Sequence, residues 1–338
     1  MTSVVRQDPT TREWVIVAPN RARRPHTPRG EPAAAPAPEV ACPFCPGNEA
    51  STPPGLLRLP GPGGSGWAVR VIPNKFGALS PSGELARRQC GPLFREMDGV
   101  GHHEVIVETP RHDHAMSRMT DAEIELVLRA YQARYKALRG DPRVKYIVIF
   151  KNHGERAGTS LTHPHSQLVA TPVPPVQMRR KYEVATAHWD DTGRCLYCDL
   201  VEAELEAKGR LVLETDRFAV FHPYASRAPF ETWIAPKRHQ PAFAQVSAED
   251  LVALARVVRR TLATLEAVLG EHDFNYILHS APVEDEAKRY YLWHLQIVPR
   301  LQTIAGFELG SGICITTMAP EESARIIRDA LDRRAGGR

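Results

Sequence analysis

The residues best suited to chemistry lie in the segment His163-Pro-His165-Ser-Gln167. Positions 163, 165 and 167 alternate, so on a β-strand their side chains face one side, about 6.5–7 Å apart. This spacing allows His163 to hold a metal while His165 reaches a substrate. A neutral imidazole is a good nucleophile toward phosphorus near neutral pH, and later a good leaving group. Gln167 can donate an amide hydrogen bond to a phosphate oxygen, and the turn at 158–160 can offer backbone N–H groups and the Ser160 hydroxyl.

Two CxxC pairs predict two metal sites. Zinc takes four sulfur or nitrogen ligands in a tetrahedron, and cysteine pairs of a reducing compartment are typical of such sites. One zinc ion is therefore expected in each half of the chain, held first by Cys42, Cys45, His112 and His163 and then by Cys195, Cys198, His239 and His294. Reduced structural thiols or redox couples are the alternatives. Cys90 and Cys314 have no partners in this pattern and are expected to be small buried hydrophobic residues.

Three landmarks of the sequence occur twice in the same order. Cys42-Pro-Phe-Cys45 is matched by Cys195-Leu-Tyr-Cys198, the segment 108–112 by 234–239, and the segment 163–167 by His294-Leu-Gln296. Such recurrence indicates an internal duplication of one α+β unit. We therefore expect a catalytic unit over residues 1–180 and a second unit over residues 181–338.

The elements that must position these residues follow from hydrophobic periodicity. Alternation predicts strands at 12–17, 68–73, 104–109, 144–150, 218–221, 230–235, 274–279 and 291–298. Helical spacing predicts helices at 121–139, 248–269 and 320–334. Asp121 or Thr120 is the expected cap of the first helix, and Ser247 begins the second. Proline-rich loops are expected at 28–40 and 53–66.

Composition limits the class of protein. The 338 residues are 43% hydrophobic and 24% charged, as in an ordinary globular chain, and 29 prolines favour loops and strand edges over a helical bundle. A formal charge of +4 suits small anionic substrates and does not require nucleic acid. No run of about 18 apolar residues predicts a membrane span, and the N-terminus lacks the apolar stretch of a signal peptide. These features predict a cytoplasmic protein.

The segment His163-Pro-His165-Ser-Gln167 resembles the His-Pro-His-x-Gln signature of the galactose-1-phosphate uridylyltransferases, a branch of the histidine-triad superfamily. Residues 12–25 resemble the N-terminal segment of that family, and residues 70–76 resemble its nucleotide-binding loop. The resemblance covers nearly the whole chain. It implies an α+β fold of tandem duplicated histidine-triad-like half-barrels, with mainly antiparallel strands and flanking helices, assembled as a homodimer.

The resemblance also implies roles for individual residues. His165 takes up the nucleoside monophosphate, and Gln167 holds the phosphate where triad hydrolases have a third histidine, which favours transfer over hydrolysis. Gln296 is expected in place of a nucleophile in the second half, which would then be catalytically silent. Further substrate-binding positions are implied, with the two arginines reaching across a dimer interface: Arg21, Arg24, Asn74, Phe76, Asn152 and Ser160.

Two activities are compatible with this resemblance. The first is UDP-glucose–hexose-1-phosphate uridylyl exchange, a step of galactose metabolism with nucleotide-sugar and hexose-1-phosphate substrates. The second is ADP-glucose phosphorolysis or adenylyl transfer, because the chain resembles plant-type relatives at Lys75, at its second cysteine pair and at residues 305–312. Gln167 disfavours a triad hydrolase. The small net charge disfavours a zinc module that binds nucleic acid.

Overall fold

Both halves of the chain contribute to one ten-stranded sheet in the computed structural model, which describes residues 2–23 and 42–336. All neighbouring strands of this sheet pair antiparallel, in the order β3-β4-β7-β9-β8-β13-β14-β12-β11-β10. The order is symmetric about the β8–β13 pair. The strands are β3 (Leu57–Pro60), β4 (Trp67–Pro73), β7 (His102–Val107), β8 (Tyr146–His153), β9 (His165–Thr171), β10 (Leu211–Glu214), β11 (Phe218–Phe221), β12 (Thr232–Pro236), β13 (Phe274–His279) and β14 (His294–Pro299).

The symmetry of the sheet agrees with the duplication read from the sequence. Five strands of each half follow one another in mirrored order, so that β9 corresponds to β14 and β8 to β13. The α+β class and the mainly antiparallel strands are confirmed. The predicted division after residue 180 falls inside a helix, and the sheet runs across both halves without a break.

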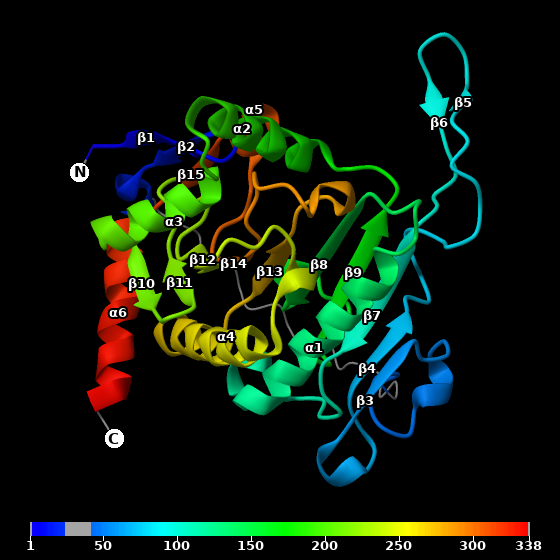
Figure 1. Ribbon diagram of the computed structural model, residues 1–338. Helices are drawn as coiled ribbons and strands as arrows, with labels where there is room; N and C mark the ends of the chain where they lie inside the picture. Colours follow the sequence, from blue (N-terminus) through cyan, green and yellow to red (C-terminus); the bar gives the residue numbers. More distant parts are fainter. Residues whose placement is uncertain (1, 24–41, 337–338) are drawn as a thin grey trace.

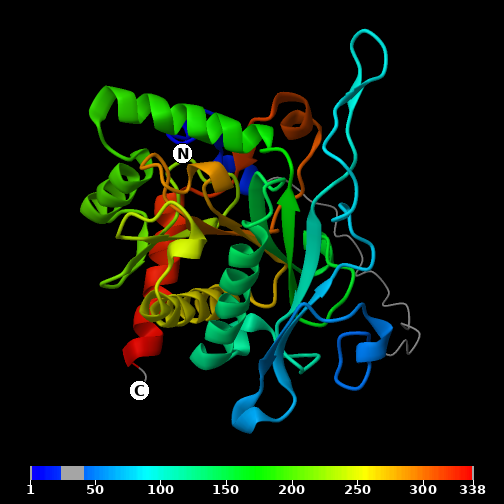
Figure 2. The ribbon, with the colours of Figure 1, turned by 45° about the vertical axis from the view of Figure 1, so that its right-hand side comes forward.

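One face of the sheet is covered by two amphipathic helices, α1 (Asp121–Leu138) and α4 (Ala248–Leu269), which contact each other (Figure 2). Their apolar stripes join inward-facing strand residues in a single buried core that includes Ile124, Leu254 and Ile149. Thr120 and Glu123 form a capping box at the start of α1, and Ser247 caps α4. The predicted bounds of α4 are confirmed, and α1 ends one residue earlier than predicted.

The opposite face of the second half is covered by α2 (Val176–Thr192) and α3 (Leu196–Ala207), neither of which was predicted. In α2 only four side chains are buried, so its sequence carries a weak helical stripe. The second CxxC pair opens α3, with Cys195 at the N-cap. Because α3 follows a helix rather than a strand, the position of this CxxC pair in the fold differs from that in a thioredoxin-type redox site.

A small sheet joins the two ends of the chain. It consists of β1 (Val4–Gln7), β2 (Trp14–Val17) and β15 (Cys314–Thr316), with β15 parallel to β2. The first turn η1 (Pro19–Arg23) follows it, with the Ala18 N–H bonded to the Thr316 carbonyl. The N-terminal segment therefore lies against the second half. The short helix α5 (Gly306–Ser311) and the last helix α6 (Pro320–Gly336) complete this side.

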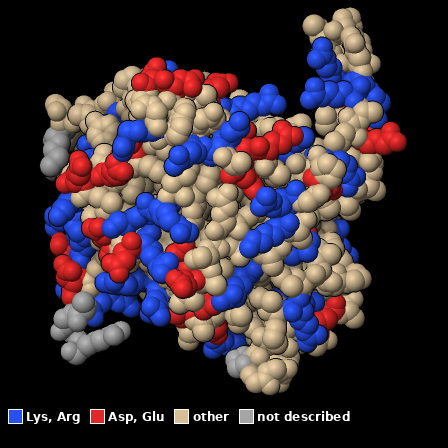
Figure 3. Space-filling model, viewed as in Figure 1, with Lys and Arg blue, Asp and Glu red and all other residues tan. Residues whose placement is uncertain are grey.

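A hairpin of β5 (Arg88–Gln89) and β6 (Arg95–Glu96) projects from the body (Figures 1 and 2). Positive and negative side chains are interspersed over the face seen in Figure 3. Among the described helices, none combines the length and hydropathy needed to cross a bilayer. The predicted loop at 28–40 lies outside the described residues.

Candidate active site and metal centres

His165 begins β9 on the sheet face away from α1, and only 7% of the residue is exposed. Its Nδ1 lies 2.8 Å from the carbonyl oxygen of His163. A carbonyl accepts only, so Nδ1 carries the proton and Nε2 keeps its lone pair. Burial, followed by the nearby charge of Lys151, holds the pKa of His165 below its usual value. The backbone therefore fixes the tautomer that a nucleophilic imidazole requires. Strand β9 begins at His165, so His163 lies in the preceding loop rather than on the strand.

This environment predicts how reaction rate depends on pH. Because burial holds the pKa of His165 below that of a free imidazole, the ring is neutral near pH 8 and 7, and its nucleophilicity is lost only at the acid end of the range. Single-turnover formation of a nucleotide adduct, followed from pH 5 to 8, should show a flat upper arm. An apparent pKa above 7 for the acid limb would contradict this account of the site.

Gln167 is oriented by His103, to which the sequence analysis assigned no role. His103 Nδ1 accepts from the Ala78 N–H at 3.0 Å, so its Nε2 carries the proton and donates to Gln167 Oε1 at 2.8 Å. Asn74 Nδ2 lies 3.5 Å from the same oxygen. With its oxygen engaged, Gln167 presents its amide NH₂ group to the sheet face that carries His165. That group is the donor expected for a phosphate oxygen.

A cavity of about 470 Å³ brings together His165, Asn152 and Ser160. The turn that encloses it uses Gly154 and Gly158 at φ of 85° and 87°, in the left-handed region that favours glycine. The N–H groups of Gly158 and Thr159 bond to the carbonyls of Glu155 and Gly154. These two N–H groups are therefore not available for phosphate, contrary to the sequence-based expectation. Ser160 remains the donor of this turn that lines the cavity.

Behind β9, on the α1 face, a buried ion pair holds the strand in place. Lys151 Nζ lies 2.6 Å from Glu108 Oε2 and also donates to the His165 carbonyl at 3.0 Å. Both side chains are at most 2% exposed. Ser166 donates to the other oxygen of Glu108 at 2.6 Å, and Tyr131 donates to it at 3.3 Å. The network anchors the backbone that carries the nucleophile.

Glu108→Gln should lower the free energy of unfolding by more than the loss of a solvent-exposed charge does. The substitution keeps the shape but leaves the Lys151 ammonium buried without a counter-charge, which costs about 3–5 kcal/mol. Thermal unfolding measures this effect. Glu96→Gln, in a pair with Arg88 whose side chains are 57% and 51% exposed, is the matched control and should leave the melting temperature close to that of the wild type. Equal melting temperatures for the two variants would show that the buried pair has no special role.

Cys42, Cys45, His112 and His163 converge, and their ligand atoms all lie within 4.8 Å of one another. Cys42 and Cys45 Sγ lie 3.7 and 3.6 Å from His163 Nδ1, and Cys45 Sγ lies 3.4 Å from His112 Nδ1. Ligands of a tetrahedral zinc ion, at about 2.0–2.3 Å from the metal, lie roughly 3.3–3.8 Å apart. The Nε2 of His163 donates to the Thr109 carbonyl at 2.8 Å, which leaves Nδ1 free for a metal. The four residues fit zinc.

Phe44 couples this cluster to the nucleophile. Its ring meets the His163 ring edge-on at 6.0 Å between centroids and the His165 ring at 5.4 Å. Phe44 lies inside the first CxxC pair and is 7% exposed. A metal that fixes Cys42 and Cys45 therefore also fixes the side chain that packs against His165. The sequence analysis did not identify Phe44.

In the second half, Cys195, Cys198 and His239 form a group of three candidate ligands. Cys198 Sγ lies 3.3 Å from His239 Nδ1. A hydrogen bond from Cys198 lowers the pKa of the Cys195 thiol to about 5, and a thiolate is the form that binds metal. The predicted fourth ligand, His294, is not part of the group found in the described residues. Its ring Nε2 is buried without a hydrogen-bond partner among the described residues, and its role as the fourth ligand stays a prediction.

His294 begins β14, as His165 begins β9, and its Nδ1 lies 3.1 Å from the carbonyl oxygen of Leu292. Strand pairing nevertheless matches His165 with Gln296. His165 pairs with Val107, three residues before Pro110, and Gln296 pairs with Trp233, three residues before Pro236. The assignment of Gln296 to the nucleophile's place stays a prediction, and this register agrees with it. His294 is 1% exposed and stacked on Trp233 at 4.2 Å, so that no substrate reaches its ring.

A family model described as the N-terminal domain of galactose-1-phosphate uridyl transferase matches residues 1–175 of this chain, which is more than half of it. The chain belongs to the galactose-1-phosphate uridyl transferase family. A second model, described as a domain of unknown function, matches residues 103–338.

Relatives of the chain within this family carry two different names. An ADP-glucose phosphorylase of Arabidopsis thaliana is 34% identical over 96% of this chain and 92% of its own. The galactose-1-phosphate uridylyltransferase of Thermotoga maritima is 29% identical over 96% and 98%, and that of Haemophilus influenzae is 30% identical over 90% and 87%. The solved Arabidopsis ADP-glucose phosphorylase with bound ADP-glucose superposes with a TM-score of 0.83 at 31% identity, covering 97% of this chain and 99% of that one. A solved uridylyltransferase gives 0.76 at 30% identity, covering 97% and 98%.

Some implied site residues of the uridyl transferase family are not brought to the cavity. Arg21 is exposed in η1, beside β15, and is not among the residues that line the cavity around His165. Arg24 lies outside the described residues. Phe76 is 85% exposed, with its N–H bonded to Asn74 Oδ1, and is likewise absent from the lining. Cys90 is exposed, contrary to the expectation that it is buried.

Proposed function

We propose that this chain is a nucleotidyltransferase that moves a nucleoside monophosphate from a nucleotide sugar to a second phosphate through a covalent bond to His165. The first candidate reaction converts UDP-glucose and galactose 1-phosphate to UDP-galactose and glucose 1-phosphate. The observation that carries the proposal is the His165 ring, which has Nδ1–H bonded to the His163 carbonyl and Nε2 free at a cavity. The names of the relatives support the same chemistry.

In the first half-reaction, the Nε2 lone pair attacks the α-phosphorus of the nucleotide sugar. An N–P bond forms, and the bond from that phosphorus to the bridging oxygen breaks. The electron pair leaves with the oxygen, which releases a hexose 1-phosphate. The Nδ1–H bond to the His163 carbonyl stabilises the positive charge that develops on the ring. No separate base is needed, because the attacking nitrogen carries no proton.

In the second half-reaction, a phosphate oxygen of the acceptor attacks the same phosphorus and the N–P bond breaks. The imidazole leaves neutral, in its original tautomer. The Gln167 amide NH₂ group, held by His103, donates to a phosphate oxygen in both steps. Unlike a histidine at this position, the amide has no proton to give to a leaving group, and this difference favours transfer over hydrolysis.

Zinc at the first cluster would be held by Cys42, Cys45, His112 and His163, and a second zinc ion by Cys195, Cys198 and His239, with His294 as the predicted fourth ligand. When bound, each ion supplies rigid cross-links between loops rather than a reacting group. In the first half, those cross-links hold His163, whose carbonyl sets the tautomer of His165. We therefore propose a structural role for both metals.

A second candidate activity is ADP-glucose phosphorolysis, in which inorganic phosphate accepts the adenylyl group. The ADP-glucose phosphorylase of Arabidopsis is 34% identical to this chain, against 29–30% for the two bacterial uridylyltransferases. Both candidates use the same nucleophile and the same two half-reactions. They differ in the base that is bound and in the acceptor.

Initial rates with UDP-glucose or ADP-glucose as donor, each with galactose 1-phosphate or phosphate as acceptor, separate the candidates. The first predicts that UDP-glucose with galactose 1-phosphate is fastest, with ping-pong kinetics. Faster adenylyl transfer to phosphate would select the second candidate. Net hydrolysis with no transfer to either acceptor would overturn both.

We also propose a cytoplasmic homodimer. Arg21 lies in η1 beside the second half, away from the His165 cavity of its own chain. This placement leaves it free to contact phosphate in the site of a second copy, as the family resemblance implies. Sedimentation velocity measures the assembly, and a monomer at micromolar concentration would contradict it.

A further inference from the structure

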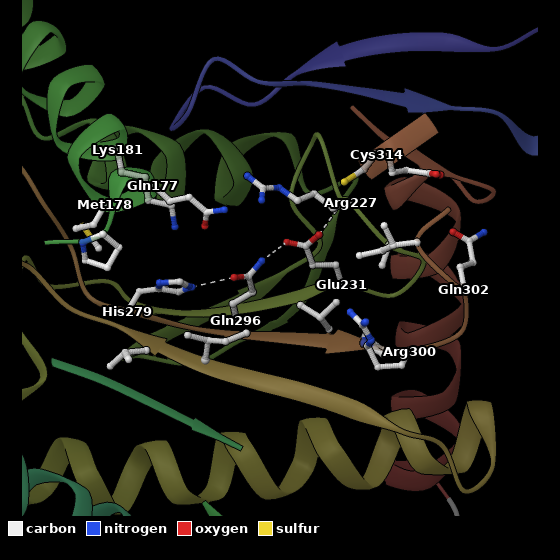
Figure 4. A pocket seen from close by; sticks show the side chains of 18 of the residues that line it. Gln177, Met178, Lys181, Arg227, Glu231, His279, Gln296, Arg300, Gln302 and Cys314 are labelled. Carbon is white, nitrogen blue, oxygen red and sulfur yellow. Dashed lines mark hydrogen bonds between the residues drawn. The ribbon is translucent and has the colours of Figure 1, made fainter. Parts of the chain in front are cut away.

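The second half contains a cavity of about 470 Å³ that no part of the proposed reaction uses. It lies on the sheet face of β13 and β14, between α2 and the segment after β14 (Figure 4). Its volume is within the roughly 300–1,000 Å³ typical of small-molecule sites. Apolar side chains provide much of the lining, among them Tyr146, Val148, Met178 and Val298. The cavity can therefore enclose the carbon body of a small ligand.

One wall of this cavity is formed by polar side chains that hydrogen-bond to one another. His279 Nε2 lies 2.8 Å from Gln296 Oε1, and Gln296 Nε2 donates to Glu231 Oε1 at 2.7 Å. The Arg227 N–H donates to the other Glu231 oxygen at 2.6 Å, and Trp233 donates to Oε1 at 3.2 Å. Glu231 thus has its hydrogen bonds satisfied within the wall. Figure 4 draws the bonds that join His279, Gln296, Glu231 and Arg227 as dashed lines.

Lys181 lines the same cavity, but its ammonium makes no hydrogen bond to the polar side chains of this wall. It reaches from α2 toward the cavity, and the residue is only 9% exposed. In the part of the chain that the structure describes, its ammonium makes no hydrogen bond or ion pair, and its nearest ring is that of Trp233 at 5.9 Å. Burial lowers its pKa to about 8, so the group remains largely charged at pH 7. A buried ammonium that makes no hydrogen bond or direct ion pair is costly, and an anion in contact with it relieves that cost.

The charges of Asp8, Glu231 and Glu13 raise the pKa of Lys181, but among the described residues none of these carboxylates forms an ion pair with it. Asp8 accepts from the N–H and hydroxyl of Thr10 at 2.8 and 2.7 Å, and Glu13 accepts from Arg227 at 2.6 Å. The lining of the cavity contains Lys181, Arg227 and Arg300 against Glu231 and Glu308, which is a net positive set. Arg300 forms no ion pair among the described residues and lies across the cavity from Lys181 in Figure 4.

We propose that this cavity is a second, non-catalytic binding site for a small phosphate-bearing organic molecule, with Lys181 as the residue that holds the phosphate. The apolar walls favour a phosphate ester over the bare inorganic ion. The site differs from the His165 cavity in position and in residues, because the two linings share none. Chemistry at His165 does not depend on it.

Glucose 1-phosphate is the probe, with inorganic phosphate and glucose as the arms that separate the two parts of the ligand. In crystals of the full chain soaked with glucose 1-phosphate, phosphate density is expected within hydrogen-bond distance of Lys181 Nζ. Calorimetry should show one more site per chain in the wild type than in Lys181→Met, or an affinity at that site weakened about ten- to a hundredfold. Glucose alone should not bind there.

Lys136→Met, at an exposed lysine of α1, is the matched control and should bind as the wild type does. Should Lys181→Met fail to fold, Arg300→Gln carries the same test, with an affinity reduced about tenfold. An unchanged number of sites and unchanged affinity in a folded Lys181→Met protein, or density at His165 with none at Lys181, would overturn the proposal. Formation of the His165 adduct, measured separately, tests the proposed function and is expected to persist in Lys181→Met.

Discussion

Replacement of His165 by alanine is expected to reduce nucleotidyl transfer by at least about four orders of magnitude, while the protein stays folded and keeps its metal. The substitution removes the only atom proposed to bond to phosphorus. Water cannot take its place efficiently, because the second half-reaction depends on release of the nucleotide from that same ring. Mass spectrometry of wild-type protein mixed with UDP-glucose or ADP-glucose should show one nucleoside monophosphate on His165 and none on the variant.

His294→Ala is the matched control, because His294 has the same strand position and the same Nδ1 contact in the second half. It should lower stability by opening a space beside Trp233, yet leave the transfer rate near that of the wild type when measured well below its melting temperature. If His165→Ala kept its turnover, or if the adduct formed on His294 instead, the assignment of chemistry to the first half would be lost.

The catalytic strand was predictable because its chemistry lies in one short stretch of sequence. The alternation of His165 and Gln167 places both on one face of β9; His165 lines the cavity, and Gln167 is not among the residues that line it. Helices α1, α4 and α6 were predictable for a similar reason, because each has an apolar stripe that is buried in the main core. Local sequence patterns were therefore sufficient to predict the elements whose hydrophobic periodicity is strong.

The partners of these residues were not predictable, since each comes from a distant part of the chain. His103 orients Gln167 from 64 positions away, and Glu108 pairs with Lys151 across 43 positions. Phe44 reaches both histidines only because the CxxC loop folds over β9. The one available signal for the ion pair was a glutamate inside the predicted strand 104–109 and a lysine directly after the predicted strand 144–150, because unpaired charges are rare at buried strand positions.

The second half shows how far a repeat can be read without coordinates. Two alignments fit its His-x-Gln segment, one with His294 matched to His163 and one with His294 matched to His165. The strand start and the Nδ1 contact of His294 resemble those of His165. The pairing with the neighbouring strand instead matches Gln296 with His165, because their partners Trp233 and Val107 each lie three residues before a proline. The motif that precedes the catalytic strand therefore fixes the alignment, and that alignment places a glutamine where the first half has its nucleophile.

Cys42→Ala is expected to release zinc from the first cluster and to lower both stability and transfer rate. Structural zinc contributes folding free energy, so loss of one ligand that costs about 3 kcal/mol would lower the melting temperature by roughly 6–12 °C. The transfer rate should also fall, because Cys42 and Cys45 flank Phe44, whose ring packs on His165. Elemental analysis of purified protein should give two zinc ions per wild-type chain and one per Cys42→Ala chain.

Cys195→Ala and Cys90→Ala show whether a lower transfer rate comes from the first cluster itself or from a general loss of metal and stability. Cys195 belongs to the second group of ligands, so its loss should remove the other zinc ion and lower stability with little effect on His165 chemistry. Cys90 is exposed and outside both groups, so its variant should match the wild type in metal content, melting temperature and rate. A rate that falls in Cys42→Ala but not in Cys195→Ala would place the coupling in the contact of Phe44 with His165. Wild-type zinc content and melting temperature in both ligand variants would mean that neither cluster binds structural metal, and the fixed His163 carbonyl would then need another cause.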